Sequence, residues 1–265
     1  MDLQLQGKRA VVTGGSRGIG KAIARALARE GVDCALCARS EAPLVEAAKE
    51  LASETGRRIF PFVADMNDEA SIEQFISGAA SALGGIDILI NNAARRSGPL
   101  PENLENMTGE WLLQDFQEKV VGYFRCAKAV APYMKEQGWG RIINISGLAA
   151  RNAVAISAGS RNVATVNLTR NLAFELGPFG VNVNALYPGS VLTDDVRQRL
   201  DERSRSEGVP VEKLIEQAAA TSSLKRMITP EEIAQVVVFL ASPLSLAITG
   251  QVIDVTGGIG RNVYY

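Results

Sequence analysis

TGGSRGIG, residues 13–20, closes an apolar run and opens an amphipathic one. Gly14, Gly18 and Gly20 are therefore expected in a turn between a strand and a helix. Glycine permits such a tight turn and lets backbone amides approach a pyrophosphate at the positive end of the helix. The stretch predicts a dinucleotide-phosphate loop. The alternative is a glycine-rich turn that binds no ligand.

Apolar runs alternate with amphipathic stretches along the chain, which is typical of a parallel sheet covered by helices on both faces. The expected strands are Arg9–Thr13, Asp33–Ala38, Arg58–Val63, Asp87–Asn91, Arg141–Ser146, Val181–Leu186 and Gln251–Val255. The clearest helical stretches are Ile19–Glu30, Glu69–Leu83, Trp111–Gln137, Val163–Leu176 and Pro230–Ala241. Helices should end at Gly31, Gly84 and Gly138. The pattern predicts a doubly wound α/β fold.

Length and regularity bear on the domain organisation. With 265 residues, no repeats and no long linker, the chain is expected to form a single domain over residues 1–265. The segment 193–222 is the least regular part and is rich in charged residues. It is either a solvated helical excursion or a mobile lid over a substrate pocket.

The charge balance argues against two classes of partner. The formal net charge is −1, which gives no electrostatic basis for binding nucleic acid or an anionic membrane. No apolar stretch approaches the roughly 18 residues of a transmembrane helix, and Met1–Val12 lacks the basic and apolar regions of a leader. We therefore expect a cytoplasmic protein.

The cysteines allow redox or metal chemistry only in principle. Cys34 and Cys37 have C-x-x-C spacing but lie in an expected strand, where residues three apart point to opposite faces. The chain has no histidine and only one further cysteine, Cys126, so nothing completes a zinc site. We interpret all three as small buried side chains and predict no metal. The lack of histidine also removes the commonest general acid–base side chain.

The end of the second expected strand indicates which dinucleotide would bind, because it should lie near the adenosine ribose. It reads Cys37-Ala38-Arg39-Ser40 and lacks the acidic residue that accepts from the 2′-hydroxyl of NAD. Arg39 and Arg17 would instead hold a 2′-phosphate, since guanidinium groups match phosphate geometry. We predict NADP rather than NAD. The alternative for Arg39 is a solvated loop position.

Further motifs, taken together, resemble the short-chain dehydrogenase/reductase family. The glycine loop is followed by Asp65, by Asn91-Asn92-Ala93-Ala94 and by Pro188-Gly189, each after an expected strand. The resemblance extends over essentially the whole chain, through Gly140–Ser146, Asn167–Gly189, Thr249-Gly250-Gln251 and Gly257-Gly258. It implies a Rossmann-type seven-stranded sheet, a nicotinamide cofactor, hydride transfer between carbonyl and hydroxyl groups, and a homotetramer.

The resemblance also implies positions for cofactor contacts. The pyrophosphate would lie against Gly14, Ser16, Gly18, Ile19 and Gly20. Asp65 would meet the adenine, and Asn91 and Ala93 would pack near the ribose and adenine. The nicotinamide would face Pro188, Gly189, Val191 and Thr193. For Asn91 and Asn92 the alternative is structural, tying the fourth strand to its neighbours.

The family's catalytic tetrad is missing from all four positions. When the family pattern is counted back from Glu175 and Pro188 without gaps, the tyrosine position falls on Ala158 and the lysine position on Asn162. The serine position falls on Gly147, and the helical asparagine position on Lys119. Hydride transfer to a carbonyl leaves an alkoxide that needs a proton, and Ala158 cannot donate one. Asn162 could still bond a ribose hydroxyl but brings no positive charge.

Polar residues elsewhere in this region are candidate substitutes. Those expected near the site are Lys119, Ser146, Ser157, Ser160 and Arg161. Lys119 would be a replacement acid if burial lowered its pKa, or would pair with Asp115 one turn back. Ser146 is the second candidate, or a strand-end residue bonded to the backbone. Arg95 and Arg96 would recognise an anionic group or face solvent.

Three functions therefore stay open. The first, which we expect, is an NADP-dependent oxidoreductase with a non-standard proton relay, acting on an unidentified small molecule. The second is a catalytically silent NADP-binding protein, either a sensor or the non-catalytic subunit of an oligomer. The third is a non-redox enzyme such as a lyase. The intact glycine loop and Pro188–Thr193 favour cofactor binding in each case.

Overall fold

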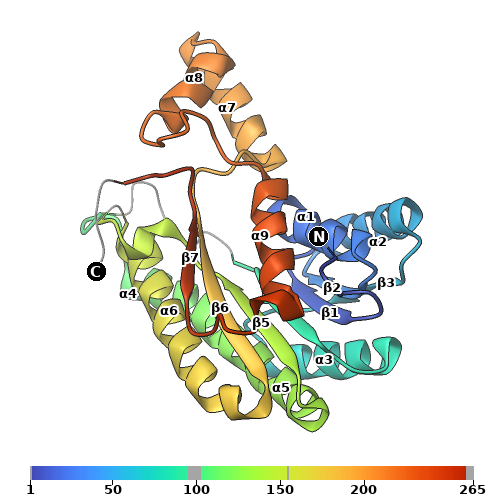
Figure 1. Ribbon diagram of the computed structural model, residues 1–265. Helices are drawn as coiled ribbons and strands as arrows, with labels where there is room; N and C mark the ends of the chain where they lie inside the picture. The colour runs from blue at the N-terminus through green and yellow to red at the C-terminus, as the bar shows by residue number, and fades with distance from the viewer. Residues whose placement is uncertain (1, 95–102, 154, 261–265) are drawn as a thin grey trace.

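A computed structural model of the protein describes residues 2–94, 103–153 and 155–260. Within these ranges seven strands form one parallel sheet in the order β3-β2-β1-β4-β5-β6-β7 (Figure 1). The strands are β1 Arg9–Thr13, β2 Asp33–Ala38, β3 Ile59–Val63, β4 Ile88–Asn91, β5 Gly140–Ile145, β6 Val181–Pro188 and β7 Val252–Val255. The order reverses beside β1, so the predicted doubly wound, Rossmann-type fold is confirmed.

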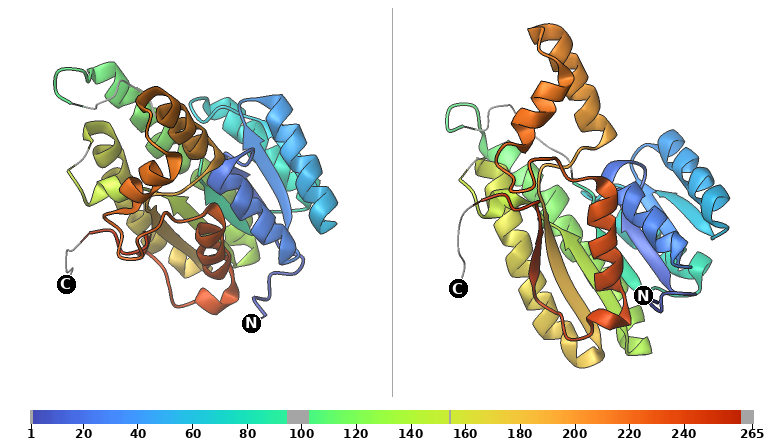
Figure 2. Two further views of the ribbon diagram at one scale, coloured as in Figure 1. Left: turned by 90° about the horizontal axis from the view of Figure 1, so that it is seen from above. Right: turned by 45° about the horizontal axis from the view of Figure 1, so that its top comes forward.

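Helices cover both faces of this sheet (Figure 2). They are α1 Gly18–Arg29, α2 Glu41–Thr55, α3 Glu69–Leu83, α4 Gly109–Phe116, α5 Gly122–Gln137, α6 Ile156–Leu176, α7 Asp194–Glu207, α8 Val211–Ala219 and α9 Pro230–Ala241. One apolar layer contains α1, α2 and α9, and the other contains α3, α5 and α6. Among the described residues, no helix combines the length and apolar character needed to cross a bilayer.

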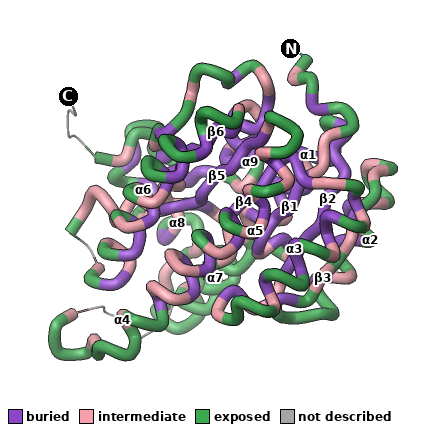
Figure 3. The backbone as a smooth tube through the Cα atoms, turned by 90° about the horizontal axis from the view of Figure 1, so that it is seen from below, coloured by how far each residue is buried: buried purple, intermediate pink, exposed green. Residues whose placement is uncertain are grey.

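The central strands β2, β1, β4, β5 and β6 are almost entirely buried (Figure 3), whereas the edge strands β3 and β7 are partly exposed. Alternate side chains enter alternate layers, so Cys34 packs against the α1 side and Cys37 against the α3 side. All three cysteines are buried and free. The interpretation of the C-x-x-C spacing as structural is therefore confirmed.

Local sequence signals set several helix ends. Thr229 caps α9: its hydroxyl accepts from the Glu232 amide, and the Glu232 carboxylate accepts from the Thr229 amide. Gly84 and Gly138 end α3 and α5 with left-handed φ values of +81° and +67°. Gly31 follows α1 with a φ of +86°. The predicted helix ends are confirmed, because only glycine adopts this conformation without strain.

Two helical predictions need correction. The stretch Trp111–Gln137 is not one regular helix, because a π-helical turn, Gln117–Val121, separates α4 from α5. That turn places Glu118 and Lys119 on the buried side. Helix α6 begins at Ile156 instead of Val163. Its first turns bury Ser157 and Arg161 against Asp115, a tertiary contact that apolar periodicity does not reveal.

The irregular segment 193–222 contains α7 and α8, which project away from the sheet (Figure 1). Helix α7 has no buried residue, so it shows no apolar stripe that a periodicity search could detect. Thr193 caps α7 by accepting from the Val196 amide. A parallel bridge between Val191 and Ile228 joins the two ends of the segment at its base.

Candidate active site

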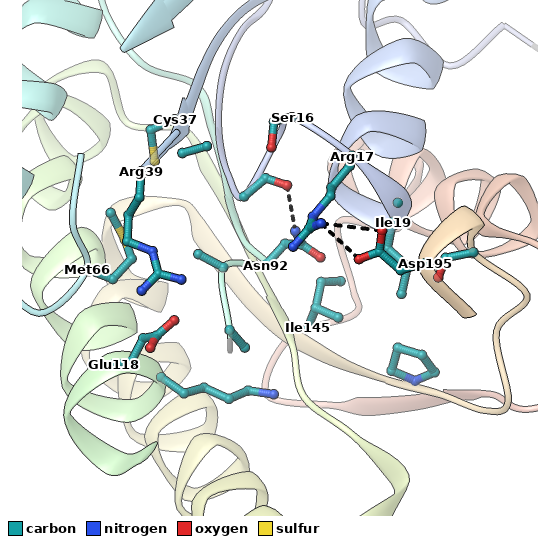
Figure 4. A pocket seen from close by; sticks show the side chains of 18 of the residues that line it. Ser16, Arg17, Ile19, Cys37, Arg39, Met66, Asn92, Glu118, Ile145 and Asp195 are labelled. Carbon is teal, nitrogen blue, oxygen red and sulfur yellow. Dashed lines mark hydrogen bonds and ion pairs between the residues drawn. The ribbon is translucent and has the colours of Figure 1, made fainter. Parts of the chain in front are cut away.

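A cavity of about 690 Å³ lies where the parallel strands end (Figure 4). Its lining comes from the carboxyl ends of β1 to β6 and from the start of α7. Twelve of the residues assigned to a cofactor from the sequence line it: Gly14, Ser16, Arg17, Gly18, Ile19, Arg39, Asp65, Ala93, Pro188, Gly189, Val191 and Thr193. This is the crevice where open α/β sheets bind ligands.

The glycine loop has the backbone that its sequence predicts. Gly14 and Gly18 have φ values of +67° and +54°, a region that disfavours residues with side chains. The Asn92 amide donates to the carbonyl oxygens of Thr13 and Gly14 and so ties the loop to the end of β4. Gly20 does not line the cavity. It packs behind the loop, where a Cβ would collide with the Gly14 carbonyl oxygen.

Asn91 and Asn162 also lie away from the cavity lining. Asn91 is fully buried and donates to the Asn144 side chain and the Tyr123 carbonyl, at 2.9 and 3.3 Å. It thereby ties β4 to β5 and α5, the structural role foreseen as an alternative. Asn162 is buried beside Gly147, and its Oδ1 has no hydrogen-bond partner among the described residues.

Two arginines and two carboxylates line the cofactor end of the cavity. Arg17 points toward Asp195 of α7 in Figure 4, with 3.1 Å between guanidinium and carboxylate. Both side chains are more than half exposed, so this ion pair is weak and exchangeable. Arg39 lines the same cavity at the end of β2. Asp65 lines it too, and its Oδ1 accepts from the backbone and side-chain amides of Asn67.

Lys119 is the buried cation of this cavity. Its side chain is 4% exposed and lines the cavity from the π-helical turn. The ammonium donates to the Ser146 carbonyl oxygen at 3.1 Å. Burial and, to a smaller extent, the nearby Arg161 lower the pKa of Lys119, Asp115 raises it, and the net value is about 7. Lys119 therefore lines the cavity and does not point elsewhere, while Asp115 one turn back still acts on its charge.

Asp115 belongs to a buried charge cluster beneath the cavity, together with Lys119 and Arg161. The Asp115 carboxylate is 3.2 Å from the Arg161 guanidinium and accepts a hydrogen bond from the Ser157 hydroxyl. The ion pair joins α4 to α6, and both residues are buried. Ser157 and Arg161 were expected near the site from the sequence, but their contacts with Asp115 were not predicted. Ser160 is exposed and bonds within its own helix.

The shape of the glycine loop shows that the cavity fits a dinucleotide. A Cβ on Gly14 would lie 2.8 Å from Asn92 Nδ2 and 3.1 Å from Ala93 Cα, so the loop must stay bare. A bare loop at the start of α1 presents backbone amides to an anion. The residues present therefore suit a nicotinamide dinucleotide.

Comparison with known proteins agrees with this geometry. The family described as "Enoyl-(Acyl carrier protein) reductase" matches residues 14–260. The short-chain reductase protein NovJ of Streptomyces niveus is 37% identical over 254 residues, covering 94% of this chain and 92% of its own. This chain belongs to the short-chain dehydrogenase/reductase family. The NADPH-dependent reductase BacG of Bacillus subtilis is 32% identical, covering 97% of this chain and 99% of its own.

The similarity extends to solved structures of the family. L-sorbose reductase from Gluconobacter frateurii, crystallised with NADPH and L-sorbose, superimposes with a TM-score of 0.94 at 29% identity. That comparison covers 99% of this chain and 100% of the reductase chain. The whole architecture described above, and not only the glycine loop, is therefore shared with the short-chain dehydrogenase/reductase family.

Against the family pattern, the positions assigned to the tetrad separate into two groups. Lys119 and Gly147 line the cavity, and so does Ser146. Ala158 and Asn162 lie on α6 outside the cavity lining. A Cβ on Gly147 would lie 2.5 Å from Asn162 Nδ2, so Asn162 occupies the space that a serine at position 147 would need. Glycine at the serine position, 147, and asparagine at the lysine position, 162, therefore fit each other sterically.

Several residues that line the cavity were not predicted as contacts from the sequence, among them Met66, Glu118 and Ile145, and Cys37 was named only as part of a strand end. Cys37 and Ile145 lie at the carboxyl ends of strands, a position that could have signalled them. Glu118 precedes a tetrad position, but its burial depends on the π-helical turn. Arg95 and Arg96 lie outside the described residues.

Proposed function

We propose that this family member is an NADP-dependent oxidoreductase that interconverts a carbonyl and a hydroxyl group of a small molecule. The observation that carries the proposal is one cavity lined by the glycine loop, by Arg17 and Arg39, and by a buried lysine. Two relatives support it by name, since one is called an NADPH-dependent reductase and one structure contains NADPH with its sugar substrate. The silent-protein alternative leaves the buried Lys119 without a role.

When bound, a reduced nicotinamide supplies a hydride to a carbonyl carbon. The chain's own residues hold and orient the two reactants. The bare amides of the glycine loop would hold the pyrophosphate, and Arg39, helped by Arg17, a 2′-phosphate. Pro188, Gly189, Val191 and Thr193 would shape the nicotinamide end. The relay is non-standard because the tyrosine and lysine positions hold Ala158 and Asn162.

We further propose how the protein is organised. Residues 1–265 would form one domain, in which α7 and α8 act as a lid over the cavity. The observation behind the lid is the exchangeable Arg17–Asp195 pair, which links the glycine loop to α7. The family's usual homotetramer is the expected assembly, and the cytoplasm the expected location.

Replacement of Gly18 by valine is expected to reduce NADPH affinity by at least about 100-fold. Gly18 has a φ of +54° at the mouth of the loop, so a branched side chain would distort the amides that face the pyrophosphate. Losing two charge-assisted hydrogen bonds from loop amides to the pyrophosphate, at roughly 1.5 kcal/mol each, would lower the affinity by about that factor. Calorimetric titration with NADPH measures it.

Gly56→Val is the matched control for the Gly18 variant. Gly56 has a similar φ of +68°, ends α2 on the surface, and has no atom within 4 Å of its Cβ position. The Gly56→Val variant should have a lower free energy of unfolding than the wild type but an unchanged NADPH affinity. Unchanged affinity in Gly18→Val would refute the assignment of the phosphate loop.

Arg39→Asp is expected to lower the ratio of NADPH to NADH affinity by about 10- to 100-fold. The change removes one charge-assisted contact of roughly 1.5–3 kcal/mol with the 2′-phosphate and adds a group that accepts from a 2′-hydroxyl. Titration of both cofactors measures the ratio. Lys49→Glu makes the same charge change on exposed α2 and should leave it unaltered. An unaltered ratio in Arg39→Asp would show that the 2′-phosphate is held elsewhere.

The function itself is tested with purified protein, NADPH and a panel containing L-sorbose, a 3-oxoacyl thioester and an aromatic ketone. Loss of the reduced nicotinamide absorbance in the presence of one of these carbonyls supports the oxidoreductase. Tight NADPH binding without turnover across such a panel would favour the silent NADP-binding protein. Absence of binding to NADPH, NADP⁺, NADH and NAD⁺ would contradict both functions.

A further inference from the structure

We propose that Lys119 is the proton donor of this site in the direction of reduction and the proton acceptor in the direction of oxidation. This inference rests on the proposed oxidoreductase function. It assigns to the π-helical turn between α4 and α5 a task that the family pattern gives to a tyrosine at position 158, where this chain has alanine.

The first argument is placement. Lys119 reaches the cavity from a π-helical turn, a distortion that is common at functional sites. It lines the cavity together with Ser146 and Gly147 at the end of β5, and with Pro188 and Gly189 at the end of β6. A substrate carbonyl bound against this part of the cavity would therefore lie in the same part of the cavity as the Lys119 ammonium.

The second argument is hydrogen-bond capacity. An ammonium carries three N–H donors, and the contact to the Ser146 carbonyl oxygen at 3.1 Å uses one. That contact orients Nζ and leaves donors for a substrate oxygen. The Ser146 hydroxyl is a weaker candidate, because it donates to the Asn162 carbonyl oxygen at 3.2 Å. Tyr123 is fully buried, bonds the Ile145 carbonyl oxygen and does not line the cavity.

The third argument concerns the charges around Lys119. Asp115 faces it from α4, Glu118 adjoins it on the π-helical turn, Tyr123 lies beside it on α5, and Arg161 faces it from α6. Burial and the Arg161 cation favour the neutral amine, and Asp115 favours the ammonium, which together bring the pKa of Lys119 to about 7. A general acid works best when its pKa lies near the operating pH.

The proposed step balances in atoms and charge. The carbonyl carbon gains a C–H bond with the two electrons of the hydride, and the C=O π bond breaks. The carbonyl oxygen gains an O–H bond as an N–H bond of Lys119 breaks, leaving a neutral amine. The substrate is reduced by two electrons and the nicotinamide oxidised by two. Water entering the cavity returns the proton to Lys119 before the next turnover.

The titration of Lys119 is measured without any substrate. Protein labelled with ¹³C at lysine Cε is titrated by NMR, and Lys119→Met identifies the Lys119 signal. We expect a midpoint near 7, as against about 10.4 for exposed lysines. A Lys119 midpoint above about 9 would overturn the proposal, because the ammonium would then be too weak an acid at neutral pH.

Kinetics with the carbonyl that the panel identifies supply the second readout. Lys119→Met should lower kcat/KM for reduction by about 100- to 10,000-fold while NADPH affinity is retained. Lys119→Arg should be equally impaired, because a guanidinium keeps the charge but cannot release its proton. Lys128→Met, an exposed lysine of α5 paired with Glu69, should behave like the wild type.

The pH profile distinguishes proton transfer from a structural role. Wild-type reduction should decline as the pH rises above about 7, and oxidation should decline as it falls below that value. Full activity in Lys119→Arg, or an unchanged rate in Lys119→Met, would overturn the role of Lys119 and leave the oxidoreductase standing. NADPH binding without turnover of any carbonyl would instead overturn the proposed function and the inference with it.

Discussion

Asp115→Ala is expected to lower the free energy of unfolding by about 3–5 kcal/mol. Its carboxylate is buried and lies 3.2 Å from the Arg161 guanidinium, whose side chain is 11% exposed. Removing the carboxylate would leave a buried cation without this counter-charge, and the Ser157 hydroxyl without its acceptor. Urea denaturation of the wild type and the variant measures the difference.

Two further variants make the Asp115 result specific. Asp115→Leu combined with Arg161→Met removes both charges and should lie much closer to the wild type, because apolar pairs often replace buried ion pairs at little cost. Glu207→Ala breaks the exposed Arg203–Glu207 pair and should leave the free energy of unfolding nearly unchanged. A loss below about 1 kcal/mol in Asp115→Ala would show that the cluster is not held in the way the structure indicates.

Lys119→Met is expected to raise the free energy of unfolding by up to about 5 kcal/mol at a pH below 7. The pKa of Lys119 falls from 10.5 to about 7 on folding, so the ammonium is less stable in the folded state than in the unfolded chain. Between these two values the unfolded state binds more protons, and wild-type stability therefore rises with pH. The advantage of methionine should shrink through this window and vanish near its upper end.

Denaturation at several pH values between about 6 and 10 tests this expectation. The exposed Lys128→Met serves as the control and should show no such dependence on pH. A Lys119→Met effect that is the same at every pH would mean that Lys119 titrates alike in the folded and unfolded states. A destabilised variant at low pH would mean that the ammonium is stabilised by its surroundings.

Both predictions concern the same buried charge cluster, which spans α4, the π-helical turn and α6. Charges of this kind usually cost stability, and residues that reduce stability are found where function requires them. If Lys119 is the proton donor, the variant that gains most stability should also lose most activity. Measuring both properties on Lys119→Met tests this trade-off directly.

Local and periodic signals in the sequence were sufficient for much of the fold. Glycine with positive φ at Gly14, Gly31 and Gly84, and the Thr229 capping box, act over a few neighbouring residues, so they are visible in the chain itself. The same holds for strands that are apolar throughout because helices cover both faces of the sheet. The cofactor end of the cavity follows from these signals, since parallel strands all end at one edge.

Contacts between distant residues were not predictable in this way. Asn91 and Asn92 are adjacent and identical in type, yet one is buried against Asn144 and the other lines the cavity. Alternation along a strand distinguishes their directions only once the neighbouring strands are placed. The early start of α6 likewise depends on Asp115, 42 positions from Ser157 in sequence.

The sequence by itself determined the doubly wound sheet, the glycine loop and the family, because these depend on periodicity, on backbone freedom and on motifs in chain order. It also predicted that tyrosine and lysine are absent from the positions where the family pattern has them. Only the tertiary structure decided what Lys119 faces. A π-helical turn buries it in the cavity beside Arg161. Its burial and the neighbouring charges of Arg161 and Asp115, which no local pattern encodes, set its protonation.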